Sequence, residues 1–581
     1  MTKPESSQSL AAISNEYWQA RLANDPLFAT VLGDRRFDDE LTDITPKGRA
    51  RVEREYESIL QRAHAIPEHG LSIADQVTRT ALIIDLQAEL DRLTCHLEDW
   101  TVDPLGGPQV EFLNVESYQP VRTPDQGRSM VKRWKAMGSY LNGHVANLQR
   151  GLNANKVAVS ACVEKVIEQI RDLEGRPDSE WALLRPLSVP HEDWTDPQRE
   201  EFRKELSNAV AESVHPAYQR YLKFLETKLL TRARPQDRPG IMHVQDGQES
   251  YRRLIHMYTS LNRSPEEIHG VGLDEVKRIN QEMTALGGSV LGTQDRKEIL
   301  TRLRTDHSLY FATRDEVVEK AESALSRAKS AIPKWFGRLP RADCEVVRME
   351  EHEEKYSTIA YYREPAADGS RPGRYYVNTS APETRPRYEA EVMAYHESIP
   401  GHHLQIAIAQ ELEGLPEFRK HSGVTAFVEG WGLYSERLGE EMGLYSSDLD
   451  RIGVLSFDAW RACRLVVDTG IHAMGWTRQQ AIDFMVENTA LAENNIVNEV
   501  DRYITWPGQA LAYKLGQLEI LRVREEAKHQ LGDGVRIEKF HDAMLSDGAV
   551  ALEVLRQIVQ RHIENARADQ TGKKKGGKLA Y

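Results

Sequence analysis

Three observations predict a mainly α-helical fold. Hydrophobic residues make up 40% and charged residues 28% of the 581 residues, which is the balance of an ordinary globular protein. Charged and apolar residues recur at helical spacing along most of the chain, and Pro and Gly divide these runs into helices of ordinary length. Signals for β-strands are few and short. We therefore expect a large helical body with a small β-sheet set into it.

The predicted elements follow one another from the N-terminus. Ser264, Pro265 and Glu267 mark one helix start, because serine favours the N-cap, proline the first helical position and glutamate the third. The clearest helical runs are residues 46–65, 74–97, 157–173, 198–229 and 313–331. Two short strands are expected at residues 344–349 and 374–379, the second after a turn-like segment rich in Gly and Pro.

Composition also limits the partners and the compartment. Lys and Arg number 75 and Asp and Glu 89, so the net charge of −14 disfavours nucleic acid and anionic membranes as partners. No apolar stretch approaches the roughly 18 residues that a membrane-spanning helix needs. The four cysteines are far apart in the sequence and form no CxxC pair, which fits a reducing compartment. We expect a cytoplasmic protein, whose oligomeric state the sequence does not predict.

A domain boundary is expected near residue 240, after the Arg- and Pro-rich segment 231–240. It would separate an N-terminal helical part, residues 1–240, from a part that carries the chemistry, residues 241–570. One continuous domain is the alternative. Residues 571–581 are rich in Lys and Gly and lack apolar partners, so a flexible basic tail is expected there.

The residues most informative about function lie between His396 and His403, where three histidines and one carboxylate fall within eight residues. A catalytic zinc site uses imidazole and carboxylate ligands and needs a further carboxylate to accept a proton from water. His396 and Glu397 begin the pattern H-E-x-x-H, but Pro400 occupies the place of the second histidine. The strict helical pair of ligands is therefore absent.

Pro400 and Gly401 should interrupt the helix, because proline lacks the amide hydrogen of the helical bond and glycine relaxes the backbone. A local insertion of two residues would bring His402 beside His396, and an insertion of three would bring His403 there instead. We favour His402 as the second ligand and leave His403 as the alternative. The histidine that does not bind the metal could orient the substrate or a ligand.

A third ligand is expected on the helical run that begins near Val424. Val424, Phe427 and Trp431 mark its core stripe, and Glu429 lies off this stripe among small neighbours that let a second helix approach. Glu436, two turns further on, is the alternative ligand. The competing interpretation of the whole set is a histidine-rich helix end and an ordinary acidic helix face.

The segments 396–405 and 429–434, His-Glu-Ser-Ile-Pro-Gly-His-His-Leu-Gln and Glu-Gly-Trp-Gly-Leu-Tyr, resemble the bacterial family catalogued as domain of unknown function 885, which is similar to gluzincin zinc metallopeptidases. Weaker marks of this resemblance lie at residues 32–38, 375–379, 464–472 and 507–516. The resemblance implies a mostly helical fold with a deep central cleft. It also implies one Zn²⁺ per chain, bound by two histidines and a glutamate.

Further roles follow from the chemistry of amide hydrolysis and from the resemblance. Glu397 would be the general base that activates water and the acid that protonates the leaving amine. A donor is needed for the charge that develops on the carbonyl oxygen. Tyr513 is the first choice by similarity to gluzincins, Tyr503 is the second, and a half-buried core tyrosine is the alternative for Tyr513.

The candidate substrate-binding residues come from three segments. Residues 373–379 are expected as an edge strand beside the motif helix, where a peptide could pair, with a plain hairpin as the alternative. Residues 464, 468 and 472 share one helical face, so a carboxylate–histidine relay near the metal is one reading and a polar ladder the other. Arg502 and Lys514 could hold a substrate carboxylate or be surface charges. The candidates are Tyr376, Asn378, His472, Arg502 and Lys514.

The sequence thus predicts a zinc-dependent hydrolase of peptide or peptide-like amide bonds in short substrates, of the carboxypeptidase, dipeptidase or oligopeptidase type. One alternative is an amidase that acts on a small metabolite. Another is a peptide-binding protein that has lost catalysis through the interruption at Pro400, although the presence of Glu397 argues against it.

Overall fold

The computed structural model describes residues 3–349, 354, 359–366, 369, 371–421 and 423–576. Helices dominate these residues, and the only sheet among them has three strands, so the predicted fold class is confirmed. The N-terminal helices are α1 Lys3–Asn24, α2 Pro26–Leu32, α3 Pro46–Ala65, α4 Ile73–Cys95, α5 Pro108–Tyr118, α6 Pro124–Asn153, α7 Ser160–Glu174, α8 Asp196–Ala209 and α9 His215–Phe224. The predicted run 198–229 is helical throughout, with π-helical turns at Val210–Val214 and Leu225–Leu229.

The second half of the chain surrounds the residues of the histidine motif. Its elements up to the sheet are α10 Gly247–Thr259, α11 Pro265–Val290, α12 Arg296–Thr305, α13 Arg314–Ala331, β1 Cys344–Arg348, β2 Ala360–Arg363 and β3 Gly373–Val377. The later helices are α15 Ala390–Glu397, α16 His402–Gln410, α17 Glu417–His421, α18 Thr425–Glu441, α19 Asp448–Ala473, α20 Arg478–Asn488, α21 Glu493–Thr505, α22 Ala512–Leu531, α23 Ile537–Leu545 and α24 Leu552–Gly576. Ser264 caps α11 through a capping box with Glu267, as predicted.

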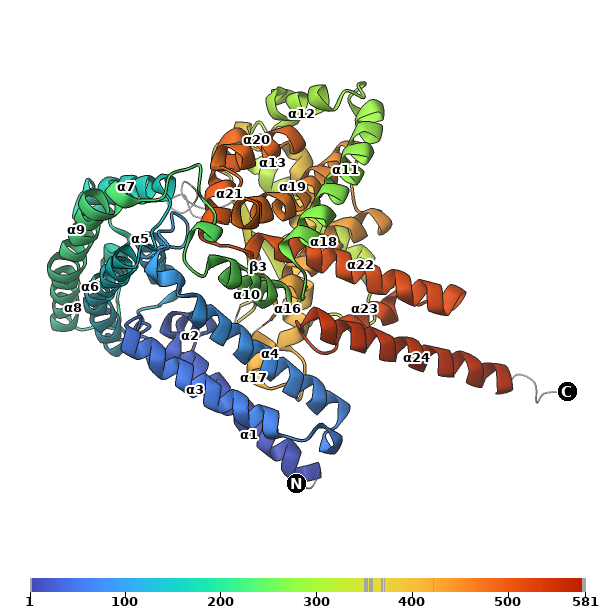
Figure 1. Cartoon of the computed structure of the whole chain (residues 1–581), viewed down its shortest axis with the longest axis horizontal. Coiled ribbons are helices and arrows are strands. Elements are labelled where there is room, and N and C mark those ends of the chain that lie inside the picture. Colours follow the sequence, from blue (N-terminus) through green and yellow to red (C-terminus); the bar gives the residue numbers. More distant parts are fainter. Residues whose placement is uncertain are drawn as a thin grey trace.

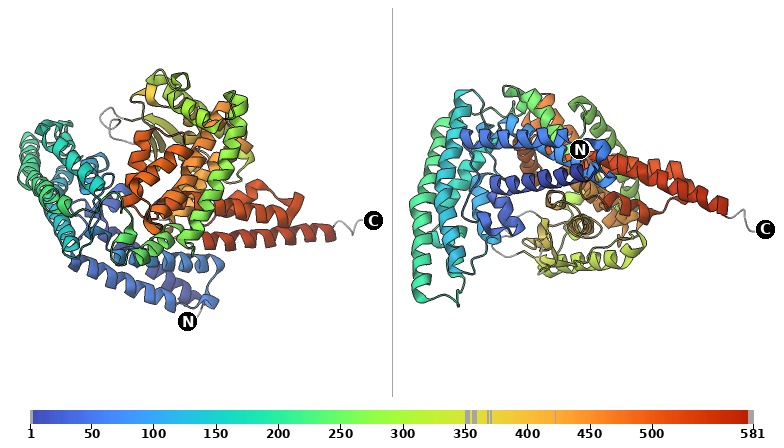
Figure 2. Two further views of the ribbon diagram at one scale, coloured as in Figure 1. Left: turned by 45° about the horizontal axis from the view of Figure 1, so that its top comes forward. Right: turned by 90° about the horizontal axis from the view of Figure 1, so that it is seen from below.

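The helices form a body with an arm on one side. Helices α5 to α9 make up the arm, α1, α3 and α4 lie side by side along the base, and α24 projects away from the body (Figures 1 and 2). Contacts cross residue 240: α4 packs on α10, and the ring of Tyr17 in α1 lies 5.7 Å from that of Phe418 in α17. Helix α24 continues six residues into the segment expected as a tail, and residues 577–581 lie outside the described residues.

The sheet differs from the prediction in two respects, because it has a third strand, β2, and because the expected edge strand is not at an edge. Its strand order is β1-β3-β2, with β1 parallel and β2 antiparallel to β3. The segment expected as an edge strand is therefore the central one, because Cys344 pairs with Gly373 on one side and Ala360 with Val377 on the other. Both neighbours occupy its backbone groups, so β3 has no free edge for a peptide.

Helix α19 is buried along almost its whole length. It packs on α11, and α18 packs on α22 at glycine contacts: a Cβ on Gly430 would lie 2.5 Å from the backbone of Gly516. No helix in the described part of the chain is both long and apolar enough to span a bilayer.

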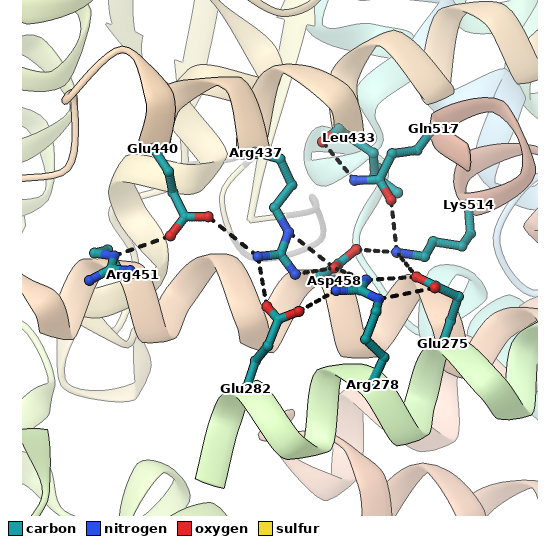
Figure 3. A network of polar contacts seen from close by, with 10 residues as sticks. All are labelled: Glu275, Arg278, Glu282, Leu433, Arg437, Glu440, Arg451, Asp458, Lys514 and Gln517. Carbon is teal, nitrogen blue, oxygen red and sulfur yellow. Dashed lines mark hydrogen bonds and ion pairs between the residues drawn. The ribbon is translucent and has the colours of Figure 1, made fainter. Parts of the chain in front are cut away.

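A buried ion-pair network joins these four helices around Asp458 (Figure 3). Lys514 of α22 and Arg437 of α18 each lie 2.6 Å from the Asp458 carboxylate, and Arg278 of α11 lies 3.3 Å from it. Lys514 is completely buried and also contacts Glu275 and Gln517. Its predicted role as a substrate-binding cation does not agree with this position, because its charge is already neutralised inside the helix packing.

Candidate metal centre

The helix that carries His396 is interrupted where the sequence predicts. Helix α15 ends at Glu397 and α16 begins at His402, with a short non-helical turn between them. Gly401 is needed in this turn because a Cβ there would lie 1.9 Å from the carbonyl oxygen of His396. The carbonyl oxygen of Pro400 accepts hydrogen bonds from the Trp431 indole, at 2.9 Å, and from a serine hydroxyl of the same helix, α18.

The interruption brings His396 and His402 together with Glu429 of α18. One ligand atom from each residue lies within 4.8 Å of those of the other two. The Nε2 atoms of both histidines are 3.6 Å from Oε2 of Glu429. Two atoms that each bind a tetrahedral zinc at about 2.0–2.1 Å lie about 3.3 Å apart, so this arrangement fits Zn²⁺ after small side-chain shifts.

His403 lies outside this cluster. Its Nδ1 is 2.9 Å from the Tyr362 hydroxyl of β2, and its Nε2 is 3.1 Å from the carbonyl oxygen of Ala342. Burial lowers the pKa of His403 to about 4, so the ring is neutral. Gly373 of β3 leaves space for it, because a Cβ there would meet Nδ1 at 2.4 Å. His403 thus joins α16 to the sheet, and the structure favours His402 as the ligand.

His396 is held in place by a second glutamate. Its Nδ1 donates to Oε1 of the buried Glu436 at 2.8 Å, and its Nε2 faces Glu429. Burial disfavours the charged ring, but hydrogen bonds with Glu429 and Glu436 raise the pKa of His396 to about 10. Two carboxylates directed at one imidazole produce an environment that attracts a cation.

Gly432 leaves space for the imidazole of His396 because it has no side chain. A Cβ at Gly432 would lie 2.5 Å from Cε1 and 2.9 Å from each ring nitrogen. The two glycines of the Glu429–Gly432 segment therefore have separate functions, since Gly430 admits α22 and Gly432 admits His396. His402 packs against His396 edge to face, with ring centroids 4.6 Å apart.

Glu397 follows His396 directly and is half-buried. Burial raises the pKa of Glu397, and the charge of Glu429 adds to this effect, while the neighbouring His402 and His396 oppose it. A carboxyl with a raised pKa beside a candidate metal centre is suited to exchange protons with water and with an amine.

Tyr513 and Arg502 lie next to each other. Tyr513 is 9% exposed, and a guanidinium nitrogen of Arg502 is 3.3 Å from its hydroxyl. The alternative residue Tyr503 is different, because its hydroxyl is 2.8 Å from Glu499 and also accepts hydrogen bonds from Arg464 and Trp460. Tyr503 is thus fully engaged in the core.

The other candidate substrate residues are engaged in structural contacts. Tyr376 stacks on Tyr361 across the sheet, with ring centroids 4.7 Å apart. His472 is buried and bridges the backbone N–H of Ile241 and the carbonyl oxygen of Tyr503. Asn378 is buried and lines a cavity of about 590 Å³ beside α15, together with Tyr375, Glu389, Met393 and Phe457.

Sequence reasoning did not predict that Glu436 is the hydrogen-bond partner of His396. It also did not predict that Gly432 leaves the space for the His396 ring. The available signal for Glu436 was its spacing of seven residues from Glu429, which places both carboxylates on one face of α18. It also missed Arg461 of α19, which lies 3.9 Å from Glu436, because no motif in the sequence distinguishes this arginine from a surface charge.

Comparisons with known proteins give the family. The family profile described as "Bacterial protein of unknown function (DUF885)" matches residues 26–559. The crystal structure of "the putative lipoprotein from Colwellia psychrerythraea" has 28% identity and a TM-score of 0.88, covering 96% of this chain and 99% of that chain. A "putative lipoprotein of unknown function from Shewanella oneidensis" has 18% identity and a TM-score of 0.72, covering 95% and 99%, and shows the shared fold.

No curated protein matches the chain. Because the profile covers most of the sequence, the chain belongs to this family of bacterial proteins of unknown function, DUF885.

Proposed function

We propose that the protein is a metal-dependent hydrolase of peptide or peptide-like amide bonds in short substrates. The observation that supports this most directly is the meeting of His396, His402 and Glu429, with both Nε2–Oε2 distances at 3.6 Å and Glu397 next in the chain to the first of them. Two imidazoles and one carboxylate, with a coordination position left open, are the donor set of catalytic rather than structural zinc sites.

Each residue of the site has its own role in the proposed reaction. A divalent ion held by His396, His402 and Glu429 would supply Lewis acidity, which polarises a carbonyl and lowers the pKa of water. Glu397 takes the proton from the attacking water and returns it to the amine that leaves. The Tyr513 hydroxyl, with Arg502 against it, donates to the developing charge on the carbonyl oxygen.

The burial of the site supports a short substrate. His396 and His402 are 3% and 9% exposed, so only a thin chain or a small molecule can reach them. A folded protein would have to open over several residues to enter such a site. An amidase for a small metabolite would use the same residues. The length of the substrates that are cleaved distinguishes an amidase from a peptidase.

The test begins with metal content and turnover of the same preparations. Elemental analysis of the wild type should give about one zinc per chain, with the metal lost in His402→Ala and Glu429→Ala but retained in His403→Ala. Zinc-loaded Glu397→Gln should keep its metal and lose the cleavage of dipeptides and blocked tripeptides.

Two outcomes would contradict the proposal. A wild type that stays metal-free after reconstitution would leave a peptide-binding protein as the better explanation. Full activity of the Glu397→Gln protein would remove the proposed base.

The cytoplasmic location belongs to the proposal as well. All four cysteines are buried and free, which fits a reducing compartment. The description of two structural relatives as lipoproteins would instead place this chain at a membrane. Fractionation of cells with an antibody to the chain separates these locations, and recovery in the membrane fraction would contradict the cytoplasmic one.

A further inference from the structure

Three arginines lie close together, and one of them, Arg461, approaches Glu436 of the candidate metal centre at 3.9 Å. Arg461 and Arg464 lie one turn apart on α19 and are 4% and 2% exposed. The Arg461 guanidinium lies over the ring of Trp460 at 4.1 Å, and that of Arg464 lies over the ring of Tyr513 at 4.3 Å. Arg502 of α21 lies 3.3 Å from the Tyr513 hydroxyl. Aromatic faces thus fix the guanidinium planes in a largely buried position.

Several N–H groups of these arginines have no acceptor. Nε and Nη1 of Arg461, Nη1 of Arg464 and Nε of Arg502 are buried and lack a hydrogen-bond partner within the described residues. A buried donor that is left unpaired costs about 1–3 kcal/mol, and more when the group is charged. Buried polar groups in proteins are nearly always paired. Four such atoms in one cluster therefore leave donors that the described residues do not satisfy.

The charges of the cluster do not balance either. Glu499 is the carboxylate shared by Arg464, at 2.9 Å, and Arg502, at 3.3 Å, so one negative charge faces two positive ones. The carboxylate nearest to Arg461 is Glu436 at 3.9 Å, which already accepts from His396. Burial lowers the pKa of Arg461, and the charge of Arg464 adds to this effect.

The cations of the network around Asp458 are paired, in contrast to those of the arginine cluster. There Lys514 reaches two carboxylates and a side-chain amide, all within 3 Å, and Arg437 reaches three carboxylates (Figure 3). The two networks share helix α19, with Asp458 one turn before Arg461. The Asp458 network is paired throughout, whereas the arginine cluster has N–H donors without an acceptor in the described part of the chain.

The position of Arg461 relative to the metal centre sets the length of the ligand. Its guanidinium and the His396 imidazole both approach Oε1 of Glu436, at 3.9 and 2.8 Å. An extended peptide advances about 3.3–3.6 Å per residue. A carboxylate on the arginines would therefore lie one or two residues beyond a carbonyl at the metal centre.

We infer that Arg461, Arg464 and Arg502 form a subsite for the terminal carboxylate of a short peptide. Guanidinium groups bind carboxylates through paired N–H donors, and the excess positive charge of this cluster would be neutralised by one such group. This inference rests on the proposed hydrolase function and specifies it, because a carboxylate held there directs cleavage to the C-terminal end. The released product is a single amino acid or a dipeptide.

The test uses matched pools of N-acetylated tripeptides that end in a free carboxylate or in a carboxamide. Binding is measured on zinc-loaded Glu397→Gln protein by titration calorimetry, and cleavage is measured on zinc-loaded wild type by mass spectrometry. The carboxylate pool should bind at least about tenfold more tightly, since charge-assisted pairs are worth about 1.5–3 kcal/mol. In the Glu397→Gln protein, the further substitution Arg461→Gln should abolish this preference. Arg461→Lys in the same protein should keep part of it.

Arg451→Gln is the matched control, because Arg451 lies on the same helix with its side chain 47% exposed and should leave the preference unchanged. Equal binding of the two pools, binding of neither, or a preference that survives Arg461→Gln would overturn the subsite. Cleavage of both pools at equal rates would overturn the subsite and leave the hydrolase function standing. Carboxylate-selective binding without any cleavage would support the subsite and contradict the hydrolase function.

Discussion

Replacing Gly432 by alanine should selectively weaken metal binding. The new Cβ would lie 2.5 Å from Cε1 of His396 and 2.9 Å from both ring nitrogens. Carbon atoms in contact prefer about 3.5–4.0 Å, so the ring has to move by about 1 Å. The hydrogen bond from Nδ1 to Glu436, at 2.8 Å, opposes that movement. A metal site tolerates deviations of about 0.2 Å in its bond lengths, so the displaced ring is a poorer ligand.

The expected loss can be given a magnitude. Changes that disturb the residues behind a metal ligand weaken binding by about tenfold to a hundredfold, which corresponds to about 1.4–2.7 kcal/mol. Helix propensity acts in the other direction, because alanine is favoured over glycine in a helix interior by up to about 1 kcal/mol. We therefore expect a folded Gly432→Ala protein whose zinc affinity falls much more than its stability.

The assay is zinc titration against a chromophoric chelator, combined with urea unfolding of the metal-free protein. Gly270→Ala is the matched control, because Gly270 also lies in a helix, α11, and a Cβ there would meet nothing within 4 Å. It should gain stability and keep its zinc affinity. Zinc affinity of Gly432→Ala equal to that of the wild type would refute the reasoning, since the ring would then not depend on this clearance.

Three further predictions concern buried carboxylates. Asp458→Asn should lower the free energy of unfolding by about 3–5 kcal/mol, because it leaves buried cations without their counter-charge, and urea unfolding measures this; a loss below 1 kcal/mol would contradict it. Burial raises the pKa of Glu389 from 4.5 to about 7. Between these pH values the folded state holds a proton that the unfolded state has lost, so the free energy of unfolding should fall by about 3 kcal/mol as the pH rises through this interval. Glu389→Gln should remove that fall, and an unchanged pH profile of urea unfolding would argue against it. Glu436→Gln should weaken zinc binding at least about tenfold, because His396 loses its charged partner, and the same chelator titration should detect no change if Glu436 only fills space.

The fold class and the individual elements could be predicted because they depend on local signals. Residues 46–65 form α3 with the predicted bounds, since Thr45 at the N-cap and Pro46 at the first position define the start. The strand at residues 344–349 was also recognisable. The strand at residues 374–379 was recognisable too, but its pairing was not, because parallel pairing between β1 and β3 joins segments about 30 residues apart, and neither segment encodes which side of the sheet it takes.

The candidate site, like the fold, could be predicted from the sequence only in part. The residue types that could hold a metal were recognisable from His396, Glu397 and Glu429, whereas the choice between His402 and His403 depended on how many residues the interruption inserts. Lys514 shows the limit for charged residues. A lysine is usually a surface cation, but the partners of Lys514, Asp458 and Glu275, come from two other helices and become adjacent only in the folded chain.

The interruption at Pro400 is tied to the candidate metal centre through helix α18. The indole of Trp431 and the hydroxyl of Ser435 both donate to the Pro400 carbonyl, at 2.9 and 3.2 Å, and the helix that supplies these donors also supplies Glu429. An unbroken helix would place a residue six positions after His396 about 9 Å further along its axis, well beyond the reach of a shared ion. The interruption is therefore what allows His402 to approach Glu429. For this reason the Pro-Gly sequence does not by itself argue for a protein that has lost its chemistry.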